Sequence, residues 1–436
     1  MLLIGIDIGT TSICGILYDR DNKKTIQSYS VSNNYIDEKS AAQSPSAIFS
    51  KVLDIINSFI SFSKDSHIEG LSISSQMHGI LYVDKEGNAI TPFYTWQNQW
   101  GLIAGKEEEI SNILDFNVYS GYGIVTHLQN PQVKKNAMYF CNIGDYVLMK
   151  LSGNKVPISD ISIAASMGIW NTEKSCMVSE YPTENYLFPK VLTIPTVIGE
   201  YDGIKLVQAI GDNQASFLGS VTEIDKSILL NYGTSGQLSL YSDDSFSFDG
   251  FEKRPLGEGF LYVAFSLSGG DSFKLLANFF AEAMNLGDFD GKTSIYEALD
   301  KIDISKISNE GITFSPYFQG KRGSDKIDAS ITGLTKLNFH PFNVFRALLE
   351  GITQELYQYY ILLPPSLIMQ KNILIGAGNG IKKNRNLRTV INEYYKREIV
   401  LSNEIEDSCI GSIIHLSVAL DLDKNYREGI VFINNS

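Results

Sequence analysis

Residues 2–18 read Leu2-Leu-Ile-Gly-Ile-Asp-Ile-Gly-Thr-Thr-Ser-Ile-Cys-Gly-Ile-Leu-Tyr18. The mostly apolar runs at 2–7 and 13–18 predict two buried strands, joined by a turn of glycine and hydroxyl-bearing residues. No Gly-Lys-Ser/Thr sequence follows this turn, so it differs from a Walker loop. Its backbone amides, at Gly9 and the two threonines after it, could approach a phosphate. A plain hairpin turn is the alternative interpretation.

A second segment repeats this layout in the other half of the chain. An apolar run at 227–231 leads into Tyr232-Gly-Thr-Ser-Gly-Gln237, and a further strand is predicted at 238–241. Two such hairpins are more specific than either alone, and they predict two related domains. A chain of 436 residues is long enough for both. We place the boundary near residue 224, which gives domains 1–224 and 225–436.

Asp212 lies at a predicted junction between a strand and a helix. An apolar run at 204–210 predicts the strand, and the sequence continues as Gly211-Asp-Asn-Gln-Ala-Ser-Phe-Leu-Gly219, with helical character. The N-terminus of a helix favours a negative charge. Asp212 could therefore cap the helix, as Asp often does, or act as a catalytic base. This stretch alone favours the cap.

Two further segments offer polar groups to a ligand. A predicted strand at 68–73 delivers Ser74-Ser-Gln-Met-His-Gly79, and ligand contacts in open α/β sheets lie just past such strand ends. A structural histidine is the alternative there. The segment Thr95-Trp-Gln-Asn-Gln-Trp100 combines indole rings with amides, which suits the C–H faces and hydroxyls of a sugar. A loop anchored by two tryptophans is the simpler alternative.

Other segments predict the framework. Helices are expected from Pro45, over 142–153, from 267–271 onward, from Pro341 and, as the last one, over 410–420. The helix that opens at 267–271 has an apolar stripe of Phe273, Leu276, Phe279 and Phe280. A strand at 373–375 ends in Gly376-Ala-Gly-Asn-Gly380. This glycine run would let a ring or a phosphate approach closely, although a tight turn needs glycine as well.

Composition and charge exclude several classes. The net charge of -13 argues against nucleic acid as a main partner, because phosphate binding needs clustered Lys and Arg. The four cysteines are scattered, which argues against a disulfide framework or structural zinc and favours a reducing cytoplasm. The sequence contains no run of about eighteen apolar residues, so no membrane span is expected. The N-terminus lacks the basic region of a signal peptide.

Six motifs in order along the chain resemble those of the FGGY carbohydrate kinases. This family is a branch of the superfamily that includes actin, hexokinase and the heat-shock chaperone ATPases. The motifs are Asp7-Ile-Gly-Thr-Thr11, Gln76-Met-His-Gly79, Trp96-Gln97, Gly211-Asp-Asn-Gln-Ala215, Gly233-Thr-Ser235 and Gly376-Ala-Gly-Asn-Gly380. The resemblance implies an α/β fold of two ribonuclease-H-like domains of the actin/hexokinase ATPase type. It implies that ATP, bound by the C-terminal domain, meets a sugar bound by the N-terminal domain in an interdomain cleft.

The resemblance also implies roles for individual residues. Asp212 matches the catalytic base, and Asp7 matches the carboxylate near Mg²⁺. The residues assigned to the sugar are Gln76, Met77, His78, Trp96, Asn98 and Asn213. The residues assigned to ATP are Gly9, Thr10, Thr11, Gly233, Thr234, Gly270, Gly376, Gly378 and Asn384.

The motif Gln76-Met-His-Gly79 is similar to those of xylulokinases and sedoheptulokinases. Three other motifs lean toward sedoheptulokinase, namely Thr95-Trp-Gln97, Gly144-Asp-Tyr-Val147 and Gly211-Asp-Asn-Gln-Ala-Ser216. We therefore expect ATP-dependent phosphorylation of a primary hydroxyl of a ketose, sedoheptulose-like by preference, with a homodimer as a possible assembly. Xylulose, another ketose or a polyol is the alternative acceptor, and a catalytically weak sugar- or nucleotide-binding regulator is the alternative class. The chain departs from the family pattern at 98–100, where Asn-Gln-Trp replaces the usual acidic residue and Gly-Arg is missing.

Overall fold

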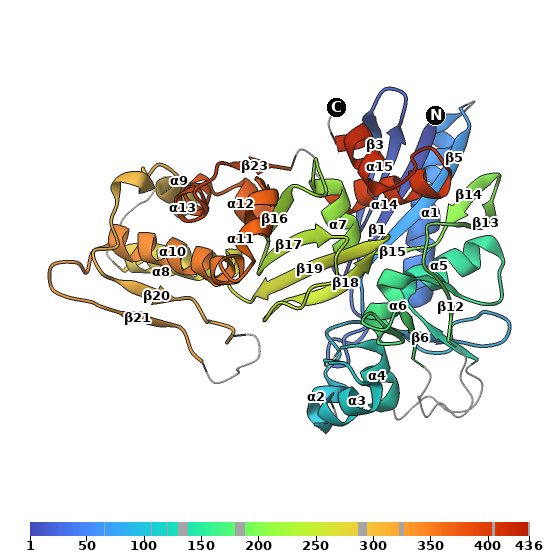
Figure 1. Cartoon of the computed structure of the whole chain (residues 1–436), viewed down its shortest axis with the longest axis horizontal. Helices are drawn as coiled ribbons and strands as arrows, with labels where there is room; N and C mark the ends of the chain where they lie inside the picture. Colours follow the sequence, from blue (N-terminus) through green and yellow to red (C-terminus); the bar gives the residue numbers. More distant parts are fainter. Residues whose placement is uncertain are drawn as a thin grey trace. The chain divides into compact units, whose positions relative to one another are not determined.

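The structure is a computed structural model that describes residues 1–64, 66–105, 107–119, 121–129, 138–178, 188–286, 294–321, 327–402 and 406–434. The chain forms two compact units (Figure 1). The first unit comprises 1–224, 254–260 and 403–436, and the second comprises 225–253 and 261–402. The first long segment ends at 224, where the sequence placed the boundary. The second unit differs from the predicted 225–436, because two later segments return to the first unit.

The first unit is built on a sheet of order β13-β14-β5-β1-β2-β3, in which β15 also pairs with β5. Its strands are β1 (Leu2–Ile8), β2 (Ser12–Asp19), β3 (Lys24–Ser32), β5 (Ile68–Ser75), β13 (Val197–Tyr201), β14 (Ile204–Val207) and β15 (Ile210–Gly211). Strand β1 is antiparallel to β2 and parallel to β5, so that Asp7 lies beside Cys14 on one side and Ser74 on the other. The predicted hairpin of residues 2–18 is confirmed.

The sheet of the second unit repeats this arrangement. Its order is β18-β19-β17-β16-β22-β23. The strands are β16 (Ser227–Tyr232), β17 (Gly236–Ser242), β18 (Glu252–Leu256), β19 (Gly259–Ser266), β22 (Ile373–Ala377) and β23 (Ile399–Leu401). Strand β16 is antiparallel to β17 and parallel to β22, as β1 is to β2 and β5. The duplication that the two glycine-hydroxyl turns predicted is therefore present in the strand pairing.

Helices cover the sheet of the first unit. They include α1 (Pro45–Ser63), α5 (Ile143–Ser152), α6 (Ile161–Met167), α7 (Asp212–Ser220), α14 (Asp407–Ala419) and α15 (Tyr426–Asn434). Helix α1 is capped by Ser44 and buries its predicted apolar face. Helix α14 packs directly on β1, where a Cβ atom on Gly5 would lie 2.4 Å from the Cys409 carbonyl oxygen. This close packing explains why the C-terminal segment belongs to the first unit.

The C-terminal segment also holds a helix that the sequence did not predict, because α14 was expected to be the last. Helix α15 follows it and packs against α14 and α7. The loop between them is anchored by the buried pair of Arg20 and Asp423, whose closest atoms are 2.7 Å apart. Arg20 also donates to Ser417 Oγ at 3.0 Å and lies over the Phe432 ring.

Smaller elements complete the first unit. The helices are α2 (Trp100–Ala104), α3 (Glu107–Leu114) and α4 (Gly123–Gln129). The paired strands are β4 (Ala42–Gln43) with β7 (Phe93–Tyr94), β6 (Leu81–Val83) with β8 (Tyr139–Cys141), β9 (Ile158–Asp160) with β12 (Lys190–Leu192), and β10 (Trp170–Asn171) with β11 (Cys176–Met177).

The second unit adds helices to its sheet. They are α8 (Gly270–Asn285), α9 (Ile295–Asp300), α10 (Pro341–Tyr360), α11 (Pro365–Gln370), α12 (Asn379–Lys382), α13 (Arg385–Tyr395) and the 3-10 turn Ile304–Lys306, and strands β20 (Thr313–Ser315) and β21 (Ser330–Thr332) form a separate pair. The predicted apolar stripe of α8 is correct for Leu276, which is buried, and wrong for Phe279, which is 63% exposed. The helix also buries Ala277, which was not predicted. Within the described ranges, no helix combines the length and apolarity needed to cross a membrane.

Candidate active site

Asp212 is the first residue of α7, directly after the short strand β15. The N-cap position is Gly211, so the capping interpretation of Asp212 is wrong by one residue. Burial raises the pKa of Asp212 to about 6, while the Arg254 guanidinium and the amides at the helix start lower it. A helix N-terminus was expected to keep this carboxylate ionised, but burial has the larger effect. A carboxylate with this pKa can accept a proton near neutral pH.

Asp7 lies at the end of β1 and accepts a hydrogen bond of 2.6 Å from Ser74 Oγ. Burial, the charge of Asp212 and the charge of Glu406 raise the pKa of Asp7 to about 7, and the Ser74 bond opposes them. A divalent cation would relieve this repulsion, and Mg²⁺ binds through one or two carboxylates while keeping several waters. The residues present therefore fit Mg²⁺, although no group of three or more acidic, histidine or cysteine side chains forms a metal site among the described residues.

The turn after β1 is braced by three buried amide side chains, Asn33, Gln43 and Gln76. Asn33 Nδ2 donates to the Gly9 carbonyl at 2.8 Å, and Gln43 Nε2 donates to the Thr10 carbonyl at 2.7 Å. Gln76 joins them, because its Nε2 donates to Gln43 Oε1 at 2.8 Å and its Oε1 accepts from Thr10 Oγ1 at 3.2 Å. Gln76, predicted to contact the sugar, thus fixes the conformation of the turn.

Two residues predicted to contact the sugar lie just past β5. His78 has a φ of 70°, its backbone N–H donates to Ser166 Oγ at 3.0 Å, and its Nδ1 lies 2.8 Å from the Ser166 carbonyl oxygen. The imidazole stacks on Tyr122 with ring centroids 4.6 Å apart. Met77 is buried, with its Sδ 3.7 Å from Arg254 Nη1. Arg254 comes from the segment 254–260, which the sequence did not connect with this site.

The tryptophan loop divides into an open and a buried part. Trp96 is 46% exposed, and its Nε1 donates to Thr10 Oγ1 at 3.0 Å, which brings the loop to the turn after β1. Asn98 is 1% exposed, and its side chain donates to the Ser40 carbonyl and accepts from the Trp100 N–H, both at 3.0 Å. Asn98 therefore holds the loop, and its predicted sugar contact has no support in this geometry.

Asn213 follows Asp212 on α7. Its Oδ1 is buried and has no hydrogen-bond partner among the described residues. A buried amide oxygen without a partner costs free energy, and a ligand hydroxyl would satisfy it.

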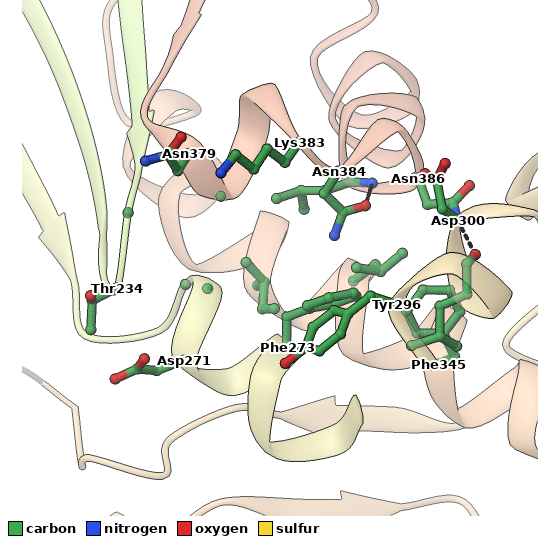
Figure 2. Close-up of a pocket in the computed structure, with 18 residues that line it drawn as sticks. Thr234, Asp271, Phe273, Tyr296, Asp300, Phe345, Asn379, Lys383, Asn384 and Asn386 are labelled. Carbon is green, nitrogen blue, oxygen red and sulfur yellow. Dashed lines mark hydrogen bonds between the residues drawn. The ribbon is translucent and has the colours of Figure 1, made fainter. Parts of the chain in front are cut away.

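A cavity of about 580 Å³ lies within the second unit (Figure 2). It is lined by Gly233, Thr234, Gly269, Gly270, Asp271, Phe273, Tyr296, Leu299, Asp300, Phe345, Leu349, Ile352, Asn379, Gly380, Lys383, Asn384, Asn386 and Leu387. Aromatic rings lie along one wall, and polar side chains of α12 and its junction with α13 lie along the opposite wall. Four residues predicted for ATP lie on this cavity: Gly233, Thr234, Gly270 and Asn384.

One end of the cavity is formed where the start of α8 packs on the turn between β16 and β17. The Gly270 N–H donates to the Gly233 carbonyl at 2.9 Å, and a Cβ on Gly270 would lie only 2.6 Å from that oxygen. Gly270 is thus required for the close approach. At the far side, Asn384 caps α13 by accepting from the Leu387 N–H at 2.9 Å.

Gly376 and Gly378, also predicted for ATP, are not among the described residues that line the cavity. Gly378 has a φ of 81°, and a Cβ there would lie 2.4 Å from Asn231 Oδ1. A Cβ on Gly376 would meet the Ile399 side chain at 2.9 Å. Both glycines are explained by close packing of β22 and the turn that follows it.

Residues 2–219 match the family model described as the FGGY family of carbohydrate kinases, N-terminal domain. This match covers half of the chain, and the chain therefore belongs to the FGGY family. It is accordingly a carbohydrate kinase, a phosphotransferase, as the resemblance implied.

Similar proteins carry several kinase names. The chain is 24% identical to a xylulose kinase of Staphylococcus xylosus, over 88% of this chain and 84% of that protein. It is 24% identical to a gluconokinase of Bacillus licheniformis (94% and 86%), and 22% identical to a sedoheptulokinase of Mus musculus (98% of each).

Solved structures agree on the fold. A ligand-bound xylulose kinase of Lactobacillus acidophilus has a TM-score of 0.83 at 22% identity, over 99% of this chain and 92% of that one. A glycerol kinase of Plasmodium falciparum, solved with ADP, has a TM-score of 0.80 at 16% identity, with the same coverage. The predicted fold class of two actin/hexokinase-type domains is confirmed.

Proposed function

We propose that the protein phosphorylates a primary hydroxyl of a ketose with ATP, and that Asp212 is the catalytic base. The observation that carries this proposal is the position of Asp212 at the first residue of α7, with its pKa raised to about 6. A base with this pKa is ionised at neutral pH and accepts the hydroxyl proton as the new bond to phosphorus forms. Asn213, with its unpartnered buried Oδ1, and His78 bind the acceptor beside it.

ATP binds in the cavity of the second unit. The aromatic wall of Phe273, Tyr296 and Phe345 suits a purine ring, because flat apolar surfaces pack against flat aromatic rings. The phosphates lie toward Gly233 and Thr234, at the turn between β16 and β17 on which the start of α8 packs. The glycerol kinase that was solved with ADP supports a nucleotide of this kind.

Asp7 holds Mg²⁺ through its carboxylate or a bound water, and the ion neutralises phosphate charge when it is bound. The charge repulsion that raises the pKa of Asp7 supports this role. The turn at Gly9 to Thr11, braced by Asn33, Gln43 and Gln76, lies directly after Asp7 and contacts phosphate oxygens.

Sedoheptulose is the first candidate acceptor, on the motifs at Thr95-Trp-Gln97 and around Asp212, and xylulose is the second. The sedoheptulokinase of Mus musculus aligns over 98% of both chains, whereas the xylulose kinase of Staphylococcus xylosus aligns over 88% of the present chain. One observation favours a different class of acceptor. The Arg254 guanidinium lies beside Met77, and its charge lowers the pKa of Asp212. A cation at this place could pair with the carboxylate of an aldonate such as gluconate.

A panel assay separates these candidates. ADP release is measured with sedoheptulose, xylulose, ribulose, glycerol and gluconate, with Mg²⁺ and ATP held constant. The proposal expects the highest kcat/KM for a ketose, and a preference for gluconate would overturn the ketose assignment in favour of the aldonate.

Asp212→Asn is expected to abolish turnover while ATP binding persists. Retained turnover in this variant would exclude Asp212 as the base, and no turnover by the wild type with any acceptor would favour a binding regulator. A homodimer and a cytoplasmic location stay predictions.

A further inference from the structure

Helix α6 makes hydrogen bonds to two segments of the proposed acceptor site, the turn before Asp212 and the residue His78. We propose that two serines on this helix position two different groups: Ser162 positions the base Asp212, and Ser166 positions the acceptor-binding His78. This inference rests on the proposed function, because it assigns to the two serines the positioning of groups that act in that reaction. Neither serine touches a substrate. The sequence did not single out either serine.

Ser162 is the link to the base. Its Oγ accepts a hydrogen bond of 3.0 Å from the backbone N–H of Gly211, the residue before Asp212. The same hydroxyl donates to Asp160 Oδ1 at 2.5 Å, and Asp160 also accepts from the Ser162 N–H at 2.8 Å as the cap of α6. Asp160 thus fixes the direction of the hydroxyl, and the hydroxyl fixes the turn from which Asp212 projects.

Both members of this link are buried, with Asp160 4% and Ser162 1% exposed. Water cannot readily replace the hydroxyl there, so its removal would leave the Gly211 N–H without a partner. The turn would then relax, and a shift of the base by about 1 Å can cost about 100-fold in rate.

Ser166 is the link to the acceptor side. Its Oγ accepts from the His78 N–H at 3.0 Å and donates to the Ile163 carbonyl at 2.8 Å, and it is 4% exposed. His78 has a φ of 70°, a conformation that costs about 1–3 kcal/mol in residues other than glycine. The hydrogen bond from the His78 N–H to Ser166 Oγ holds this conformation. The Nδ1 contact that orients the imidazole is with the main-chain carbonyl of Ser166.

The two serines are separated by one helical turn. Residues four apart lie on the same face of a helix, about 5–6 Å from each other. One rigid face therefore carries both the support of the base and the support of the acceptor-binding histidine. The spacing of these supports would set how far the base lies from the bound acceptor.

The test compares identical truncations, Ser162→Ala and Ser166→Ala, in the full chain with the best acceptor of the panel. Each removes a buried hydroxyl with two hydrogen bonds, so both are expected to lower the Tm by similar amounts. Ser162→Ala should lower kcat by about 10- to 100-fold, with the acceptor KM within about twofold of the wild type. Ser166→Ala should raise the acceptor KM by about tenfold, as expected for about 1.4 kcal/mol, with a much smaller change in kcat.

Two further variants guard against a purely structural effect. Ser162→Thr keeps the hydroxyl and should restore most of kcat. Ser220→Ala removes a buried hydroxyl at the other end of α7 that has no partner among the described residues, and both kinetic constants should stay unchanged. Equal changes of kcat and KM in the two α6 variants, or no rescue by threonine, would overturn the inference. Absence of turnover in the wild type would instead overturn the proposed function, and the inference with it.

Discussion

Ser74 Oγ donates a hydrogen bond of 2.6 Å to Asp7 Oδ1 across two neighbouring parallel strands, whose register sets these residues side by side. This bond opposes burial and the charges of Asp212 and Glu406, which together raise the pKa of Asp7 to about 7. The carboxylate that we propose for Mg²⁺ is therefore close to its titration point at neutral pH, and Ser74 favours its ionised form.

Removal of the Ser74 hydroxyl should weaken the response to Mg²⁺. In Ser74→Ala the pKa of Asp7 rises further, so less carboxylate is ionised below pH 7. We expect the Mg²⁺ concentration for half-maximal rate to rise by about 3- to 10-fold at pH 6.5, and by less at pH 8.5, where both proteins are ionised. The control is Ser72→Ala, on the same strand, whose buried Oγ has no partner among the described residues. Equal Mg²⁺ responses of the two variants at pH 6.5 would remove Asp7 from the metal site.

Asp212→Asn should stabilise the protein at high pH. The folded pKa of Asp212 is raised to about 6, above the ordinary value near 4, so the fold disfavours the ionised carboxylate. The cost to the wild type grows as pH rises from about 4 to about 6 and is complete above that range. We expect the Asp212→Asn variant to gain roughly 1–3 kcal/mol relative to the wild type at pH 8, and little at pH 4. Urea denaturation at both pH values measures this, and a gain independent of pH contradicts it.

The charge of Arg254 should determine the pH at which kcat/KM falls on the acid side of its pH profile. Its guanidinium lowers the pKa of Asp212, against the larger effect of burial. In Arg254→Gln the pKa of the base rises, and the acid limb of the kcat/KM profile should shift upward by about half to one pH unit. Lys253→Gln is the neighbouring control, because that ammonium bonds Ser245 in the second unit. An unshifted acid limb in Arg254→Gln would mean that another group controls it. A loss of gluconate turnover alone would support the aldonate alternative.

Local patterns predicted the parts of the fold whose causes are local. The hairpins at Gly9 and Gly233 follow from apolar runs on either side of small turn residues, and α1 follows from the Ser44 cap and an apolar face. The return of α14 to the first unit could not be predicted, because an apolar helix does not specify which sheet it covers. Glycines such as Gly5 give a local trace, since the missing side chain of Gly5 admits the Cys409 carbonyl.

The candidate site likewise combines residues that a local sequence motif reveals with residues that only the fold brings together. Asp212 stands in a recognisable strand-to-helix motif, whereas Asn33 and Gln43 are ordinary amides far from Gln76 in the sequence, and only the fold makes them one network. Arg254 lies in a segment that crosses from one unit to the other, so its place near Met77 had no local signal. The sugar contact of Asn98 stays a prediction, and the sequence could not foresee its bond to the Ser40 carbonyl, because a polar residue between tryptophans suits a loop support as well as a sugar contact.

Two glycines at the end of the cavity allow stability and nucleotide binding to be separated. A Cβ on Gly270 would lie 2.6 Å from the Gly233 carbonyl oxygen, so Gly270→Ala must displace α8 or the turn. We expect a loss of about 1–3 kcal/mol in the free energy of unfolding and a higher KM for ATP. A Cβ on Gly233 meets no atom within 4 Å, and this residue lines the cavity. Gly233→Ala should therefore change stability by less than about 0.5 kcal/mol and still raise the KM for ATP, because the methyl group occupies space near the phosphates. Denaturation curves and ATP titrations of both variants check this pair. An unchanged KM for ATP in Gly233→Ala would show that the phosphates do not approach this turn.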